Sequence, residues 1–253
     1  MHPMFNAKSI KIGESEILHL INIKEITPKL KKFLDKSIGE ICEGDNASDI
    51  KIVKKRLIKF LETKKDSETE KGAVAEFFAH LFLRKYGFKQ EFLFLNLEEE
   101  SIKKGFDGYY SSENEEWIFE SKSGSINTKG INHEKKIKEG YKDLQNKIAG
   151  KTKNNPWQNA YSHASMIDVK SASSLRASLK KLSEDFTNKK FYKIKNFNII
   201  PSSTIFLEGK WKDVPAQTKT TILELINKFE YKKIHILCVH KNSLELFREY
   251  LIS

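Results

Sequence analysis

The strongest constraint on the fold comes from one apolar helical run, residues 71–86. The run ends at Gly87, and glycine is typical of the position just past a helix C-terminus. Gly72, Ala73 and Ala79 are small enough for the helix to pack closely on a sheet. The run therefore predicts a helix that lies against β-structure, which favours a fold of the α/β class.

Strand character recurs in five segments after this helix. They are apolar, and the first three are rich in aromatic or β-branched residues and separated by polar turns. The segments are residues 91–97, 106–111, 116–121, 203–208 and 234–240. The helices expected between and after them are residues 134–149, a segment opened by Pro156, 171–187, 218–229 and 243–251. This order predicts a mixed central sheet flanked by helices.

The first 66 residues differ in pattern from the rest of the chain. They combine one apolar run with two basic amphipathic segments. The elements expected there are a strand at residues 17–26 and helices at residues 28–42 and 47–63. A polar, charge-dense joint follows at residues 64–69. We expect an N-terminal, mostly helical extension over residues 1–66 and an α/β domain over residues 67–253, with a helical insertion around residues 151–195.

The chain carries a formal net charge of +11, from 45 Lys and Arg against 34 Asp and Glu. Such an excess attracts polyanions and speeds their encounter, so nucleic acid is the expected class of partner. Nearly all of the positive charge is lysine, and the chain is also rich in Asn and Ile, a pattern that drift in nucleotide composition produces as well. The lysine pairs at residues 180–181 and 189–190 are candidate phosphate contacts or part of a solvated charged face.

Two cysteines, Cys42 and Cys238, lie far apart and lack the spacing of metal-binding cysteines. Neither a disulfide framework nor a zinc site is indicated. The N-terminus has no charged segment followed by an apolar core, and no apolar run approaches the roughly 20 residues of a membrane helix. The expectation is a soluble, cytoplasmic protein without a membrane partner.

Glu120 and Lys122 are the candidate catalytic pair. They stand two residues apart at the end of a predicted strand, so their side chains project to one face while Ser121 points away. Asp107 lies near the start of the preceding strand. If these two strands are adjacent and antiparallel, Asp107, Glu120 and Lys122 meet at one edge of the sheet.

Two carboxylates brought that close repel each other, and a bound divalent cation is the usual reason to tolerate them. Mg²⁺ suits hard oxygen ligands and keeps waters for a substrate phosphate. The expected ligands are Asp107, Glu120 and the main-chain carbonyl of Ser121. The ion would polarise a phosphodiester and activate the attacking water. Lys122 would position that water or neutralise charge that develops on phosphorus.

Glu76 stands in the middle of the apolar helix, where an unpaired carboxylate would be costly to bury. It therefore needs solvent on one face or a charged partner. One interpretation makes it a supporting carboxylate of the metal site. The alternative is an ion pair with Lys71 or Arg84 on the helix surface.

The pair of Glu120 and Lys122 also has a purely structural interpretation. It can be an ordinary solvent-facing pair, with Asp107 and Gly108 forming a turn, because such tripeptides arise often in a lysine-rich chain. Three features favour the functional interpretation. The pair ends the apolar run 117–119, Asp107 lies one hairpin upstream, and the preceding helix carries an acid.

Together these residues resemble a known family. Glu76 in a helix, Gly105-Phe106-Asp107-Gly108 at a strand start and Phe119-Glu120-Ser121-Lys122 at a strand end are similar to the PD-(D/E)xK nuclease superfamily. The chain departs from the motif at Phe106, where the motif has proline. More narrowly, residues 70–150 resemble the HamA family, the nuclease subunits of Hachiman-type bacterial antiphage defence, through GAVAEFFAHLFLRKYGF, KKGFDGYY and WIFESKSG.

The resemblance implies a restriction-endonuclease-like core and cleavage of DNA with Mg²⁺, or with Mn²⁺ in its place. It also implies a helicase partner from the same defence system (HamB-like) that restrains the nuclease until foreign or damaged DNA is sensed. Carried over by position, Glu76, Asp107 and Glu120 would be the metal-binding acids and Lys122 the catalytic lysine.

Two other functions stay open. A stand-alone restriction-type endonuclease would need its own sequence recognition, yet the chain has few arginines to read bases and no helix-turn-helix or zinc spacing. A non-catalytic DNA-binding or scaffold subunit would keep the strand of Glu120 and Lys122 as structure alone.

Overall fold

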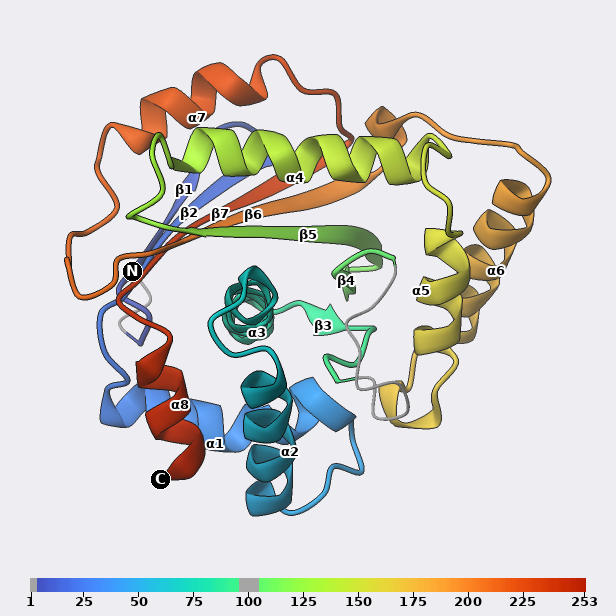
Figure 1. Ribbon diagram of the computed structural model, residues 1–253. Coiled ribbons are helices and arrows are strands. Elements are labelled where there is room, and N and C mark those ends of the chain that lie inside the picture. The colour runs from blue at the N-terminus through green and yellow to red at the C-terminus, as the bar shows by residue number, and fades with distance from the viewer. Residues whose placement is uncertain (1–3, 96–104) are drawn as a thin grey trace.

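The computed structural model describes residues 4–95 and 105–253. Within this part of the chain, seven strands form one sheet in the order β1-β2-β7-β6-β5-β4-β3 (Figure 1). The strands are β1 (Ala7–Lys11), β2 (Glu16–Ile23), β3 (Lys89–Gln90), β4 (Gly108–Ser112), β5 (Glu115–Ser125), β6 (Asn198–Phe206) and β7 (Lys233–Lys241). The four middle strands, β2, β7, β6 and β5, run parallel, and the three outer ones pair antiparallel with their neighbours. The predicted mixed sheet is confirmed.

Eight α-helices in the described residues flank the sheet. They are α1 (Pro28–Glu43), α2 (Ile50–Thr63), α3 (Glu68–Tyr86), α4 (His133–Ile148), α5 (Pro156–Ala164), α6 (Ser173–Thr187), α7 (Thr218–Ile226) and α8 (Glu245–Ile252). Figure 1 shows α4 and α7 on one side of the sheet, α3 on the other, and α1, α2 and α8 beyond α3. The α/β class is confirmed. None of these helices is long and apolar enough to cross a membrane.

Helix α3 has capping groups at both ends. The Ser67 hydroxyl accepts a hydrogen bond from the Glu70 N–H at 3.2 Å. Acidic Glu68 and basic Arg84 lie in its first and last turns, each at the favourable end of the helix dipole. Gly87 follows in the left-handed conformation with φ 107°. The helix predicted from its apolar run is confirmed.

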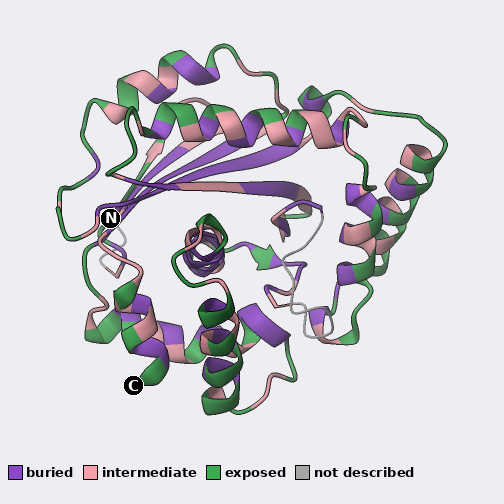
Figure 2. Ribbon diagram, in the orientation of Figure 1, coloured by how far each residue is buried: buried purple, intermediate pink, exposed green. Residues whose placement is uncertain are grey.

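The sheet separates two hydrophobic cores, and Figure 2 shows the strands between them as largely buried. Phe119 of β5 belongs to the core on the α3 side, whereas Ile118 belongs to the core on the α4 side. Neighbouring strand residues point to opposite faces. Glu120 and Lys122 therefore share the α4 side with Ile118, and Ser121 points toward the α3 side.

The segment at residues 91–97 is not the strand that its composition predicted. Strand β3 ends before it, residues 91–95 are irregular, and residues 96–97 lie outside the described residues. The N–H of Phe94 donates to the carbonyl of Ile41 at 2.9 Å. The N–H of Glu91 still donates to the Tyr109 carbonyl of β4 at 2.8 Å, but at Phe94 and Leu95 the backbone bonds to the last turn of α1 instead of continuing the ladder.

Strand β6 begins well before the predicted strand at residues 203–208. It starts at Asn198, and all nine of its residues are buried. Pro201 lies inside it, although proline cannot donate to a strand ladder and is disfavoured in central strands. Pro201 lies beside Glu120 of β5, and the ladder between β6 and β7 skips this position. The interruption accommodates the missing N–H.

The N-terminal segment contributes to the central sheet. Strands β1 and β2 lie within residues 1–66 and join the sheet beside β7, and α1 packs on α3. Strand β1 was not predicted. The domain boundary expected near residue 66 stays a prediction, as does the insertion around residues 151–195, where α5 and α6 pack against each other.

Candidate active site

Glu120 and Lys122 lie where α4 crosses close to β5. A Cβ added at Gly140 of α4 would be 3.6 Å from the main-chain oxygen of Glu120 and 3.7 Å from Cγ of Lys122. The helix is therefore in contact with this part of the strand. The two side chains meet as their spacing predicted, with Lys122 Nζ 3.0 Å from Glu120 Oε1.

Asp107, the residue just before β4, lies beside the same pair. Gly108 pairs with Phe119 across the antiparallel strands β4 and β5, which puts Asp107 beside Glu120. Oδ2 of Asp107 accepts a hydrogen bond from the Ser121 N–H at 2.8 Å. The hairpin thus brings the three expected catalytic residues into one cluster.

Glu120 is buried between two lysines. Its side chain is 2% exposed, and Lys147 Nζ lies 2.5 Å from its second oxygen, Oε2. Burial and the nearby Asp107 raise the pKa of Glu120 to about 7, although Lys147 and Lys122 act in the opposite direction. Near neutral pH this carboxyl is therefore divided between its protonated and ionised forms.

Lys147 and Asp143 of α4 complete the cluster, and sequence reasoning missed both. Asp143 Oδ2 lies 2.5 Å from Lys122 Nζ. Burial alone would lower the pKa of Lys122, but Glu120 and Asp143 raise it above its ordinary value, so this lysine stays protonated at neutral pH. The available signal was an acid and a base four residues apart on the helix after β5, which an exposed helical pair also produces.

Glu76 approaches the cluster from α3, on the opposite side of the sheet from α4. It is 5% exposed, and its Oε1 lies 3.1 Å from Nε2 of His80, one turn further along the helix. The Tyr110 hydroxyl hydrogen-bonds to the other ring nitrogen of His80. A buried chain of polar groups therefore leads from Tyr110 through His80 to Glu76.

The electrostatic effect of Glu76 falls on Asp107. Burial is the main cause that raises the pKa of Asp107, and Glu76 is the second. Lys71 and Arg84, the surface partners considered for Glu76, both pair with other acids. Glu76 thus acts on the site through Asp107.

The residues present fit a divalent cation held by two carboxylates. Asp107 raises the pKa of Glu120, so a bound cation would favour the ionised form of that carboxyl, and Mg²⁺ commonly takes one or two carboxylates plus waters. Among the described residues, no three His, Cys, Asp or Glu side chains are grouped to hold a metal. The role expected for Glu76 as a metal-binding acid stays a prediction. Both Glu120 oxygens contact lysines, so a cation would displace at least one of them.

Ser121 has a defined place in this cluster. Its N–H donates to Asp107, and its side-chain oxygen is buried without a hydrogen-bond partner among the described residues. The role expected for its main-chain carbonyl as a metal ligand stays a prediction.

Comparison with models of known protein families gave no match, and neither did comparison with curated protein sequences. The functional assignment therefore depends on the chemistry of the cluster itself.

Proposed function

We propose that this chain is a metal-dependent deoxyribonuclease that hydrolyses phosphodiester bonds on a PD-(D/E)xK core. The observation that carries the proposal is the meeting of Asp107, Glu120 and Lys122 in one buried, charged cluster. Two acids with raised pKa values beside a protonated lysine are a combination typical of catalytic sites.

Asp107 and Glu120 would hold Mg²⁺, or Mn²⁺ in its place, with the main-chain carbonyl of Ser121 as a further ligand. When bound, the ion supplies polarisation of the phosphate and a lower pKa for the attacking water. Its positive charge would favour the ionised form of Glu120, which burial and Asp107 oppose. Glu76 would support the site by acting on Asp107.

Lys122 would contribute a fixed positive charge. Glu120 and Asp143 hold its ammonium group in place and keep it protonated, which makes it a poor general base. We therefore assign it two tasks, orientation of the attacking water and stabilisation of the charge that builds on the phosphate oxygens while the ester bond breaks.

DNA is the proposed substrate because the net charge of +11 favours a polyanion. The proposed biological role is that of an effector in bacterial antiphage defence, restrained by a helicase partner until foreign or damaged DNA is sensed. Support for that role is the resemblance of residues 70–150 to the HamA family.

The test is cleavage of linear, circular and single-stranded DNA in Mg²⁺ and in chelator. Wild type is compared with Glu120→Gln and Lys122→Met. Lys138→Met and Glu134→Gln are matched controls, since both residues are exposed on α4. We expect metal-dependent loss of DNA by wild type and both controls, and rates lowered by about 10²- to 10³-fold in the two site variants.

If the wild-type protein is inactive without a partner, the assay is repeated with the helicase partner and ATP. Cleavage that survives Glu120→Gln would contradict the assigned site. Inactivity in both assays, with a folded protein, would contradict the nuclease proposal.

A second candidate function is a non-catalytic DNA-binding subunit. Two observations favour it: both oxygens of Glu120 are engaged by lysines, and the described residues contain no group of three metal-binding side chains. Titration calorimetry with Mg²⁺ separates the two. An affinity for DNA that chelator does not change, together with no heat of Mg²⁺ binding, would support the second function.

A further inference from the structure

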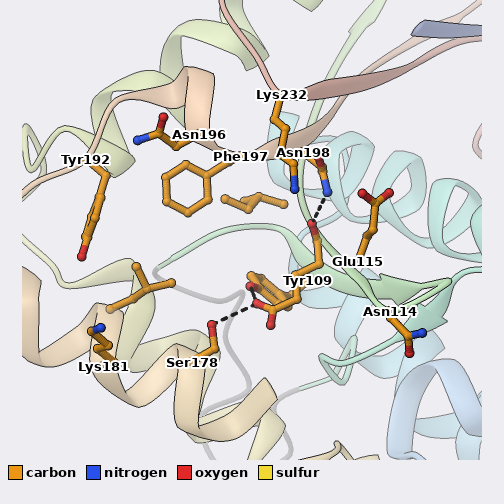
Figure 3. A pocket seen from close by; sticks show the side chains of 13 residues that line it. Tyr109, Asn114, Glu115, Ser178, Lys181, Tyr192, Asn196, Phe197, Asn198 and Lys232 are labelled. Atoms are coloured by element: carbon orange, nitrogen blue, oxygen red, sulfur yellow. Dashed lines mark hydrogen bonds between the residues drawn. The ribbon is translucent and has the colours of Figure 1, made fainter. Parts of the chain in front are cut away.

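A second site lies further back along β5, on the α4 side of the sheet. It is a pocket of about 420 Å³ between α6, the turn that joins β4 to β5, and the start of β6 (Figure 3). Its volume falls within the range of about 300–1,000 Å³ that is usual for small-ligand sites. Ile118 lines it, and Glu120 follows two residues later on the same face of β5. At about 3.3 Å per residue, that step is about 7 Å along the strand.

Two aromatic rings line the pocket on the side formed by the segment before β6. Tyr192 and Phe197 are each half-buried, with ring centroids 6.1 Å apart and ring planes at 85°. Phe197 stacks on Trp157, and the Tyr192 hydroxyl donates to Asp185. Each ring is thus fixed by a residue that does not line the pocket, which makes both rings suitable stacking surfaces for a planar ligand.

Polar groups on the opposite walls can bond the edge of such a ligand. Figure 3 shows Ser178 and Lys181 of α6 across from Phe197, and Asn198 beside the β5 end of the pocket. Nδ2 of Asn198 donates to the Glu116 carbonyl at 3.0 Å. Its Oδ1 is buried, and no described residue donates a hydrogen bond to it.

The charges that remain available at the pocket are positive. Glu115 is paired with Lys233 at 2.7 Å. Glu116 accepts hydrogen bonds from Tyr109 and Ser178, and burial raises its pKa. The negative charge of Glu115 is therefore balanced by Lys233, and the protonated form of Glu116 is favoured by burial.

Lys181 and Lys232 are exposed at the rim of the pocket. Within the described residues, neither forms an ion pair. Their ammonium groups are therefore available to an anionic ligand, and phosphate is the anion that accompanies a planar base in a nucleotide.

We infer that this pocket binds one nucleotide, with its base against Tyr192 and Phe197 and its phosphate at the rim, where Lys181 and Lys232 lie on opposite sides. The nucleotide is either an unpaired residue of a DNA strand or a free mononucleotide. The inference deepens the proposed function, since a bound unpaired nucleotide close to Glu120 would favour single-stranded or frayed DNA as substrate. Binding itself requires neither metal nor cleavage.

The test is binding in chelator, measured by fluorescence anisotropy with a labelled single-stranded oligonucleotide and a blunt duplex of equal length, and by calorimetry with dAMP. Tyr192→Ala removes the stacking ring, and Tyr192→Phe keeps it. The double variant Lys181→Ala/Lys232→Ala is compared with Lys219→Ala/Lys228→Ala, which removes the same charge from exposed lysines outside the pocket.

We expect Tyr192→Ala to weaken single-strand binding about tenfold, equivalent to about 1.4 kcal/mol, and Tyr192→Phe to leave it nearly unchanged. The pocket lysine pair should reduce both the affinity and its salt dependence more than the control pair does. If the same variants also weaken the binding of dAMP, the ligand is a free nucleotide. If they weaken only the binding of the oligonucleotide, the ligand is an unpaired residue of a DNA strand.

Equal binding by wild type and Tyr192→Ala, or equal losses in the two lysine pairs, would overturn the inference. Because cleavage is assayed separately, the two proposals can fail independently. An active nuclease with an inert pocket contradicts only this inference. A pocket that binds nucleotides in a protein without cleavage contradicts only the nuclease.

Discussion

Glu120 should make the folded protein less stable as the pH rises. Burial and Asp107 raise its pKa from the ordinary value of 4.5 to about 7. Because the folded pKa lies above the unfolded one, this group's stabilising contribution is fully present below about pH 4.5 and is lost as the pH rises through about 7. The difference between the two values corresponds to about 3 kcal/mol, a large part of the 5–15 kcal/mol that is usual for a folded domain.

The perturbation that isolates this effect is Glu120→Gln, which has nearly the same shape and does not titrate. Urea unfolding of wild type and variant is measured in chelator from about pH 4.5 to pH 8, and the two free energies of unfolding are subtracted at each pH. We expect the difference to move in favour of the variant by about 3 kcal/mol as the pH rises. Glu134→Gln, on the exposed side of α4, should show no such change.

A difference that stays constant across this pH range would refute the reasoning, because Glu120 would then ionise in the folded protein as easily as in the unfolded chain. The same experiment in millimolar Mg²⁺ connects stability to the proposed function. An ion bound at Asp107 and Glu120 would favour the ionised form, so it should flatten the pH dependence of wild type. It should leave the Glu120→Gln curve nearly unchanged.

Three further predictions concern single side chains. Lys147→Met removes a cation that lowers the pKa of Glu120. If cleavage needs ionised Glu120, the pH at which the cleavage rate rises should be higher in this variant, and an unshifted pH–rate profile would contradict this link. Tyr110→Phe removes the buried hydrogen bond between the Tyr110 hydroxyl and His80 and should cost about 1 kcal/mol of unfolding free energy in urea. A change below about 0.3 kcal/mol would show that the contact is unimportant. Asp107→Asn should abolish the heat of Mg²⁺ binding in calorimetry, and retained binding would exclude Asp107 as a ligand.

Much of the local structure could be predicted because its signals are local. The apolar run at residues 71–86 and Gly87 identify α3 without reference to any other element. The spacing of Glu120 and Lys122 places both on one strand face through the alternation of side chains alone. The hairpin between residues 106 and 121 also follows from short-range pattern, and it is what brings Asp107 beside Glu120.

The elements that sequence reasoning placed only in part or wrongly depend on distant partners. Strand β6 contains Pro201 and three small hydroxyl residues, a composition that argues against a central strand. It is a strand because β5 and β7 flank it on both sides. Residues 91–95 have strand composition, yet their backbone bonds to the end of α1, which comes about fifty residues earlier.

The sequence by itself determined where the candidate catalytic residues lie: Asp107, Glu120 and Lys122 are placed by the alternation of side chains along a strand and by one short turn. Only the tertiary structure decided their state of charge. A pKa depends on burial and on charges that the fold brings within a few ångströms, and here those charges come from Lys147 and Asp143 on α4 and from Glu76 on α3. The helical spacing of Ile137, Leu144 and Ile148 indicates which face of α4 is buried. Only packing against the sheet decides that this orientation brings Asp143 and Lys147 to Lys122 and Glu120 of β5.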